Sequence, residues 1–201
     1  MLEKKQDTKA QIFFTALRLF AANGVENVSM RDIAKEVGIK AASIYNHYSG
    51  KDQLVEACYD FMTNHYEIGR PDKKEYELLL EKGSKEDVVS IVMNQYPVDL
   101  EEHLIHSLVI LFSRMHTDKR AMEKYTELLK GSLQYLTEFA RAGIELGRFD
   151  SFNVRGVSLV FLSVSLFIAQ YRTTSADVYQ DWDAARQEMV SELINLIPFN
   201  Y

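Results

Sequence analysis

The stretch SIYNHYSGKD, residues 43 to 52, concentrates polar and aromatic side chains in a short length of chain. Asn46 carries a hydrogen-bond donor and an acceptor on one amide, the pair that matches the major-groove edge of adenine. Lys51 can neutralise a phosphate, and Tyr45 and His47 offer further hydrogen bonds. Such crowding fits three kinds of site: a packed corner, a small-molecule site or a surface that reads nucleic acid.

Patterns typical of enzymes and metal sites are sparse in the rest of the sequence. His103 and His106 have a spacing found in metal sites, but on a helix they point about 60° apart and no third ligand is evident. The glycine-rich phosphate loops and nucleophile motifs of common enzymes are absent, and Cys58 has no activating neighbour in the sequence. We therefore expect no enzymatic activity, no metal and no cofactor.

The elements that must position these side chains are helices. Apolar residues recur with helical spacing over residues 12–23, and Ser29 with Asp32 forms a capping box that begins a second helix, which ends at Gly38. A third helix is predicted over 41–48, and a longer one from Lys51. Further helices are predicted at about 73–82, 85–95, 99–116, 118–147, 153–174 and 182–196. No segment alternates with period two for long enough to form a sheet, so the fold class is all-α.

Charge is distributed unevenly along the 201 residues, whose net charge is −6. Residues 1–53 contain eight Lys/Arg and six Asp/Glu, so the remaining chain carries the whole negative excess. This asymmetry predicts two domains, residues 1–53 and residues 54–201. The single cysteine, the charged N-terminus and the short apolar run 157–169 favour a cytoplasmic protein without a secretion signal or membrane span.

Two short helices joined by Gly38-Ile39-Lys40, with a supporting helix before them, are the layout of a DNA-reading helix-turn-helix. Residues 28–54 resemble the N-terminal domain of TetR/AcrR-type transcriptional regulators. The matching positions are a hydroxyl residue, Arg31, Ile33-Ala34, Gly38, Ser43-x-Tyr45-x-His47-Tyr48, Lys51 and Leu54. The resemblance implies an N-terminal three-helix helix-turn-helix domain joined to a larger helical-bundle domain for ligand binding and dimerisation.

The resemblance also implies which residues contact double-stranded operator DNA. Ser29, Arg31, Tyr45, His47 and Lys51 are expected near the phosphate backbone, and Ala42, Ser43 and Asn46 near base edges. Packing or helix capping is the alternative for Ser29, Tyr45 and His47. Lys40 stands where the family usually has serine, which removes an N-cap worth about 1 kcal/mol but leaves a cation that could contact a phosphate.

The rest of the chain is expected to enclose a small-molecule effector, as the family's helical body usually does. Candidate lining residues are Tyr96, His103, Ser107, Phe112, Arg114, Met115, Phe139, Phe161, Phe167 and Tyr171. Arg114 could clamp a carboxylate or phosphate, or it could form salt bridges within the protein. For each apolar candidate, plain core packing is the alternative.

The resemblance further implies a homodimer, with helices 153–174 and 182–196 forming a four-helix interface between the subunits. These inferences together predict a ligand-responsive repressor that binds a palindromic operator as a homodimer and is released by its effector. The alternative is a helical small-molecule-binding or adaptor protein without sequence-specific DNA binding, which the acidic net charge and the weak base-reading chemistry of Ala41-Ala42 keep open.

Overall fold

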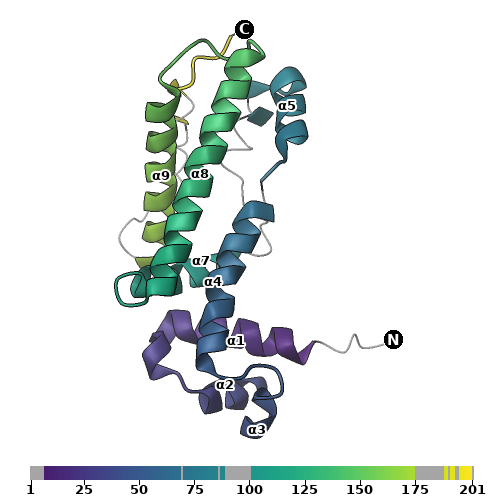
Figure 1. Cartoon of the computed structure of the whole chain (residues 1–201), viewed down its shortest axis with the longest axis vertical. Coiled ribbons are helices and arrows are strands. Elements are labelled where there is room, and N and C mark those ends of the chain that lie inside the picture. The colour runs from purple at the N-terminus through teal and green to yellow at the C-terminus, as the bar shows by residue number, and fades with distance from the viewer. Residues whose placement is uncertain are drawn as a thin grey trace, which may run out of the picture. The chain divides into compact units, whose positions relative to one another are not determined.

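The computed structural model describes residues 7–68, 70–85, 87–88, 101–174, 188–189, 191–192 and 195–200. Its elements are α1 (Thr8–Asn23), the 3-10 turn η1 (Val25–Asn27), α2 (Met30–Val37), α3 (Ala41–Ile44), α4 (Lys51–Ile68), α5 (Lys73–Lys82), α7 (Glu101–Arg114), α8 (Lys119–Glu145) and α9 (Val154–Thr174) (Figure 1). Within these ranges the elements are helical, apart from one isolated β-bridge between Phe149 and Phe199. The all-α prediction is confirmed.

The chain forms two compact units. Unit 1 contains Met1–His65 and Asp99–Tyr125, and unit 2 contains Tyr66–Val98 and Thr126–Tyr201. Residues 99–125 therefore cluster with the N-terminal residues. The division into domains at residue 53 stays a prediction.

In unit 1, α1 begins at Thr8, four positions before the predicted start, because the Asp7 carboxylate caps it by accepting from the Lys9 amide at 3.0 Å. One face of α1 is buried: Ile12, Phe13, Ala16, Leu17 and Phe20. The helices α2 and α7 both pack against α1. The inner faces of α1, α2 and α7 thus build the core of unit 1.

The two helices of the predicted helix-turn-helix are joined as expected. Ser29 and Asp32 form the predicted capping box at the start of α2. Gly38 follows α2 with φ of 80°, a left-handed conformation that a residue with a side chain rarely adopts. The buried Ile33 and Ala34 face inward from α2.

The prediction of a helix over 41–48 is wrong in its second half, since α3 ends at Ile44. The amides of Asn46 and His47 donate to the carbonyls three positions before them, at 3.2 and 3.0 Å, so the chain tightens into a turn. Ile44 and Tyr48 are buried on either side of this turn, as predicted. Because both side chains are buried, they hold residues 45–47 in place between them.

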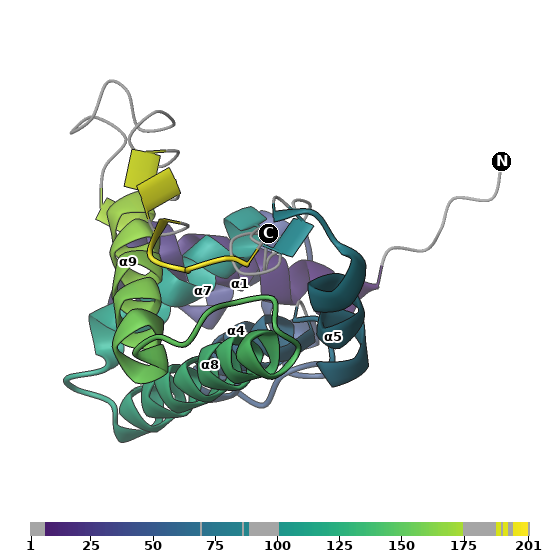
Figure 2. The same cartoon turned by 90° about the horizontal axis from the view of Figure 1, so that it is seen from above.

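Unit 2 is built around an aromatic cluster on α5, α9 and the part of α8 from Thr126 onward. Tyr76 of α5 meets Phe139 of α8 edge to face, with ring centroids 5.7 Å apart. Phe149 and Phe161 complete the cluster from the turn after α8 and from α9. Figures 1 and 2 both show α8 and α9 side by side.

Several predicted helices have different bounds or lie outside the described residues. The prediction of 73–82 is confirmed, and 118–147 and 153–174 are shorter by up to two residues at an end. The helix predicted over 99–116 ends two residues early, at Arg114, and its first two residues lie outside the described ones. The predicted helices 85–95 and 182–196 lie mostly outside the described residues. No helix within the described ranges combines the length and apolar character that a membrane span requires.

Candidate nucleic-acid interface

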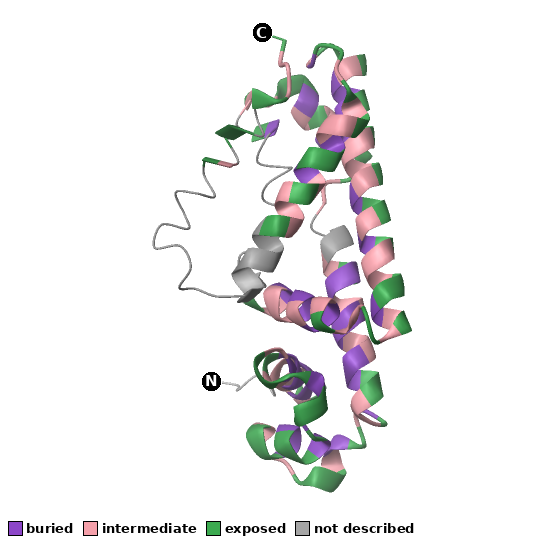
Figure 3. Cartoon of the chain, turned by 90° about the vertical axis from the view of Figure 1, so that its left-hand side faces the viewer, coloured by how far each residue is buried: buried purple, intermediate pink, exposed green. Residues whose placement is uncertain are grey.

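The turn formed by α3 and the residues after it presents polar side chains to solvent. Tyr45 is 55% exposed, which is unusual for a large aromatic residue and leaves its ring available for contact. Asn46 and Ala42 are exposed, whereas Ser43 and His47 are half-buried. Exposed segments of α2 and α3 can be followed at the bottom of Figure 3. The chain thus holds Asn46 outward on a turn anchored by the buried Ile44 and Tyr48.

The predicted phosphate-facing residues of α2 lie at or near its N-terminus. The Ser29 hydroxyl oxygen accepts from the Asp32 amide at 3.2 Å, so this side chain caps the helix. Arg31 is exposed. The dipole of a helix N-terminus and an adjacent arginine both favour an anion.

Lys40 precedes α3 and its side chain makes no capping hydrogen bond. The backbone carbonyl of Lys40 accepts from the Ser43 amide at 2.8 Å, which closes the first turn of α3 without help from a side chain. Lys40 is exposed. The departure from the usual serine therefore leaves a cation at this edge of the interface.

Lys51 begins α4 and reaches back toward the turn before α2. Its Nζ donates to the backbone carbonyl of Glu26 at 3.4 Å. The Lys51 side chain is thus placed beside η1, at the N-terminus of α4.

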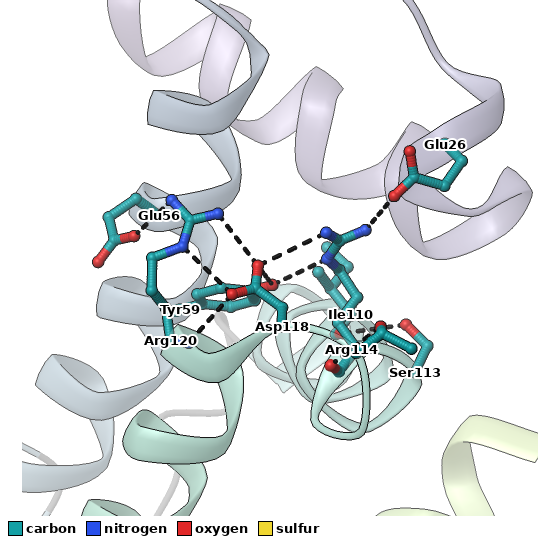
Figure 4. A network of polar contacts seen from close by, with 9 residues as sticks. Glu26, Glu56, Tyr59, Ile110, Ser113, Arg114, Asp118 and Arg120 are labelled. Carbon is teal, nitrogen blue, oxygen red and sulfur yellow. Dashed lines mark hydrogen bonds and ion pairs between the residues drawn. The ribbon is translucent and has the colours of Figure 1, made fainter.

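Glu26 also belongs to a polar network behind the interface (Figure 4). Its carboxylate accepts from the Arg114 guanidinium at the end of α7. Arg114 Nε donates to the Tyr59 hydroxyl at 3.0 Å, and the Tyr59 hydroxyl donates to Asp118 at 3.2 Å. The Arg120 guanidinium donates to both Asp118 oxygens, at 3.2 and 3.0 Å. Every member lies in unit 1.

This network shifts the pKa values of its acids. Hydrogen bonds from Arg120, above all, lower the pKa of Asp118 to about 2. Burial raises the pKa of Tyr59 to about 12, although its bond from Arg114 acts in the opposite direction. The hydrogen bond and charge of Arg114 lower the pKa of Glu26. At neutral pH the network therefore contains ionised carboxylates and a neutral phenol.

The candidate ligand residues divide between the two units. In unit 1, the ring of His103 stacks on Phe14 with centroids 4.4 Å apart, and the Ser107 hydroxyl donates to the Cys58 carbonyl. Phe112 packs against Tyr125, and Met115 is half-buried. These contacts, like those of Arg114, lie within the protein. The ligand role of these residues stays a prediction.

In unit 2, the structure brings Phe139 and Phe161 together at a small hollow of about 20 Å³, which opens onto solvent. The remaining lining residues are Leu136, Ala140, Phe149, Phe152, Val157, Ser158 and Ile197. Phe167 is 50% exposed on α9. Tyr96 and the side chain of Tyr171 lie outside the described residues. The hollow is almost wholly apolar, so it favours an apolar group.

The two histidines considered for a metal site have other surroundings. The Nε2 atom of His106 lies 4.0 Å from the Glu102 carboxylate, and burial lowers the pKa of His106. Among the described residues, no three His, Cys, Asp or Glu side chains gather in a metal-binding group.

The sequence did not predict the partners of Arg114, nor the residues that line the hollow besides Phe139 and Phe161. Glu26 and Arg114 are 88 positions apart, and no local pattern links them. A signal did exist for Phe149, because Gly143 and Gly147 precede it in GIELGRF.

Comparisons with known proteins agree with this geometry. A family model for bacterial regulatory proteins of the tetR family matches residues 12–58. The negative transcriptional regulator IcaR of the biofilm operon icaADBC, from Staphylococcus aureus, is 27% identical over 134 residues. That alignment covers 65% of this chain and spans 63% of the length of IcaR.

Solved structures share the fold across nearly the whole chain. The ketosteroid transcriptional regulator KstR2 of Mycobacterium tuberculosis has a TM-score of 0.63 and 15% identity, with 98% of both chains covered. A complex of SmeT with triclosan has a TM-score of 0.71 and 13% identity, and the match covers 97% of this chain and 93% of SmeT.

Proposed function

Because the chain belongs to the tetR family of bacterial regulatory proteins, we propose that it is a DNA-binding transcriptional repressor. The observation that carries the proposal is the turn formed by α3 and residues 45–47. Buried Ile44 and Tyr48 anchor this turn, and Asn46 and Tyr45 are exposed on it. An exposed amide on a rigid support meets the geometric requirement for reading a base edge.

Repression, a palindromic operator and a homodimer are the finer parts of the proposal. IcaR is a negative regulator by its name. A single small reading element binds weakly, and two copies on a two-fold axis supply specificity through half-sites about one helical turn apart. On α9, Leu159 and Val160 are 41% and 43% exposed, an apolar character that suits contact with a second subunit.

Release by a small-molecule effector is also part of the proposal. The small apolar hollow on α8 and α9, which four phenylalanine side chains help to line, would widen to admit it. An effector that binds the DNA-free arrangement of the dimer more tightly than the DNA-binding one would lower operator affinity. The loss would equal the difference between its binding free energies for the two arrangements.

Protection of DNA upstream of the protein's own gene, measured over a range of salt concentrations, tests the proposal. We expect a protected palindrome whose affinity falls as salt rises. Protein that is folded and dimeric but protects no sequence at moderate salt would contradict DNA reading and favour the adaptor function.

Three substitutions separate base reading from phosphate contact. Asn46→Ala should cost about 1–3 kcal/mol on the operator and little on random DNA, whereas Lys51→Ala should weaken binding to both. Asn64→Ala removes another exposed asparagine, on α4, and serves as the control that should change neither affinity. Equal losses for Asn46→Ala on the two DNAs would remove its base-reading role.

A further inference from the structure

Glu26 joins the turn before α2 to cations on two other helices. Its carboxylate accepts from Arg114 at the end of α7, and its backbone carbonyl accepts from Lys51 at the start of α4. The charge of Lys51 also contributes to the lowered pKa of the Glu26 carboxyl. The turn itself is anchored by Val25 and Val28, which are 6% and 5% exposed. Glu26 is therefore bonded to two cations, to Arg114 through its side chain and to Lys51 through its backbone.

The Arg114 end of this contact is held firmly in place. The Arg114 side chain is 20% exposed, and its Nη2 lies 3.5 Å from Asp118, in addition to its bond to Tyr59. Asp118 is itself held by Arg120, whose Nη1 donates to Glu56 on α4 at 3.2 Å. The guanidinium is thus oriented directly by Tyr59 and Asp118, and Asp118 is in turn held by Arg120. All three lie outside the helix-turn-helix.

The Glu26 end is different, because its side chain is 79% exposed. An ion pair with one solvent-exposed partner contributes little to the stability of a protein. Its effect is instead geometric, since it links the turn at the start of the helix-turn-helix to the corner where α7 meets α8.

We propose that the ion pair between Glu26 and Arg114 is a positioning contact for DNA binding, which holds η1 and, through it, the Lys51 ammonium where that group meets a phosphate. The inference rests on the proposed function, because it assumes that Lys51 and α3 contact DNA. Glu26 and Arg114 are positioning residues here and need not touch DNA. A displacement of the α7–α8 corner reaches Lys51 through the Glu26 contact.

Glu26→Gln tests the contact with little change of shape. Glu36→Gln is the matched control, because Glu36 is also an exposed glutamate in an ion pair of unit 1, with Arg18 at 2.6 Å. Both variants remove one negative charge, and this charge effect alone should raise affinity for DNA slightly and to a similar extent. We expect Glu26→Gln, but not Glu36→Gln, to weaken binding to operator and random DNA by about 5-fold, because a misplaced Lys51 loses its phosphate contact on both. Thermal unfolding of both variants checks that they remain folded.

A double-mutant cycle with Lys51→Ala tests the path through Lys51. If Glu26 acts by placing Lys51, Glu26→Gln should reduce operator affinity less when Lys51 is already alanine. Additive losses, or the same DNA affinity for Glu26→Gln as for Glu36→Gln while the wild-type protein binds its operator, would overturn the inference. Wild-type protein that protects no operator would overturn the proposed function and this inference together.

Discussion

The ring of Phe149 lies against Gly143 of α8, in the space that a β-carbon at position 143 would occupy. Gly147 allows this contact, because its φ of 70° turns the chain back directly after α8 and brings Phe149 to the helix. The amide of Phe149 then donates to the Gly143 carbonyl at 3.1 Å. Phe149 is 1% exposed as a result, and it joins the aromatic cluster of unit 2.

Gly143→Ala should therefore destabilise the protein by about 2 kcal/mol, because the added methyl group must displace a buried ring. Gly131→Ala is the control in the same helix, since the nearest atom to its new methyl group is Arg70 Nη1 at 3.9 Å. That change should stabilise the protein by about 0.5–1 kcal/mol through helix propensity. Urea unfolding measures both free energies, and a neutral or stabilising Gly143→Ala would contradict the packing described.

Asp118 should make stability depend on pH in the acid range. Its folded-state pKa is about 2, below the usual aspartate value of 3.8, so its contribution is present above the unfolded-state pKa and is lost as pH falls through the folded-state pKa. The contribution amounts to about 2 kcal/mol at neutral pH, since one pKa unit corresponds to about 1.4 kcal/mol. The Asp118 side chain is only 8% exposed, which limits screening by solvent.

The measurement is urea unfolding of the wild-type protein and Asp118→Asn between pH 2 and pH 7. The variant should be less stable at neutral pH, and its stability should fall less between about pH 4 and pH 2. Asp60→Asn is the control, because the ion pair of Asp60 with Lys124 is more exposed and should matter little. Parallel pH profiles for Asp118→Asn and the wild type would show that Asp118 is not responsible.

Lys40→Ser should change stability and DNA binding in opposite directions. Serine at this position can cap α3, which Lys40 does not, and a new N-cap is worth up to about 1 kcal/mol. Loss of the lysine charge should weaken binding to all DNA sequences and reduce the slope of log affinity against log salt by about 1. Unfolding and salt-dependent binding are measured on the same preparation. A gain in stability with an unchanged salt slope would show that Lys40 contacts no phosphate.

The helix-turn-helix could be predicted from sequence because its signals are local. Ser29 and Asp32 are three positions apart, and the left-handed Gly38 follows directly after α2, so a short window contains both partners of each interaction. The premature end of α3 could not be predicted in this way. Residues 45–47 suit a helix as well as a tight turn, and the burial of Tyr48 against the rest of unit 1 decides between them.

The sequence by itself determined the helical fold class, the helix-turn-helix and the residues that it exposes, because periodicity, caps and turns act over a few positions. Only the tertiary structure decided what Arg114 does. A guanidinium on the flank of a helix can serve a ligand or a partner in the protein equally well, and Glu26 and Tyr59 lie 88 and 55 positions away. Packing of α7 against α1 brings them together, so that the Glu26 carboxylate accepts from Arg114 while its backbone carbonyl accepts from Lys51.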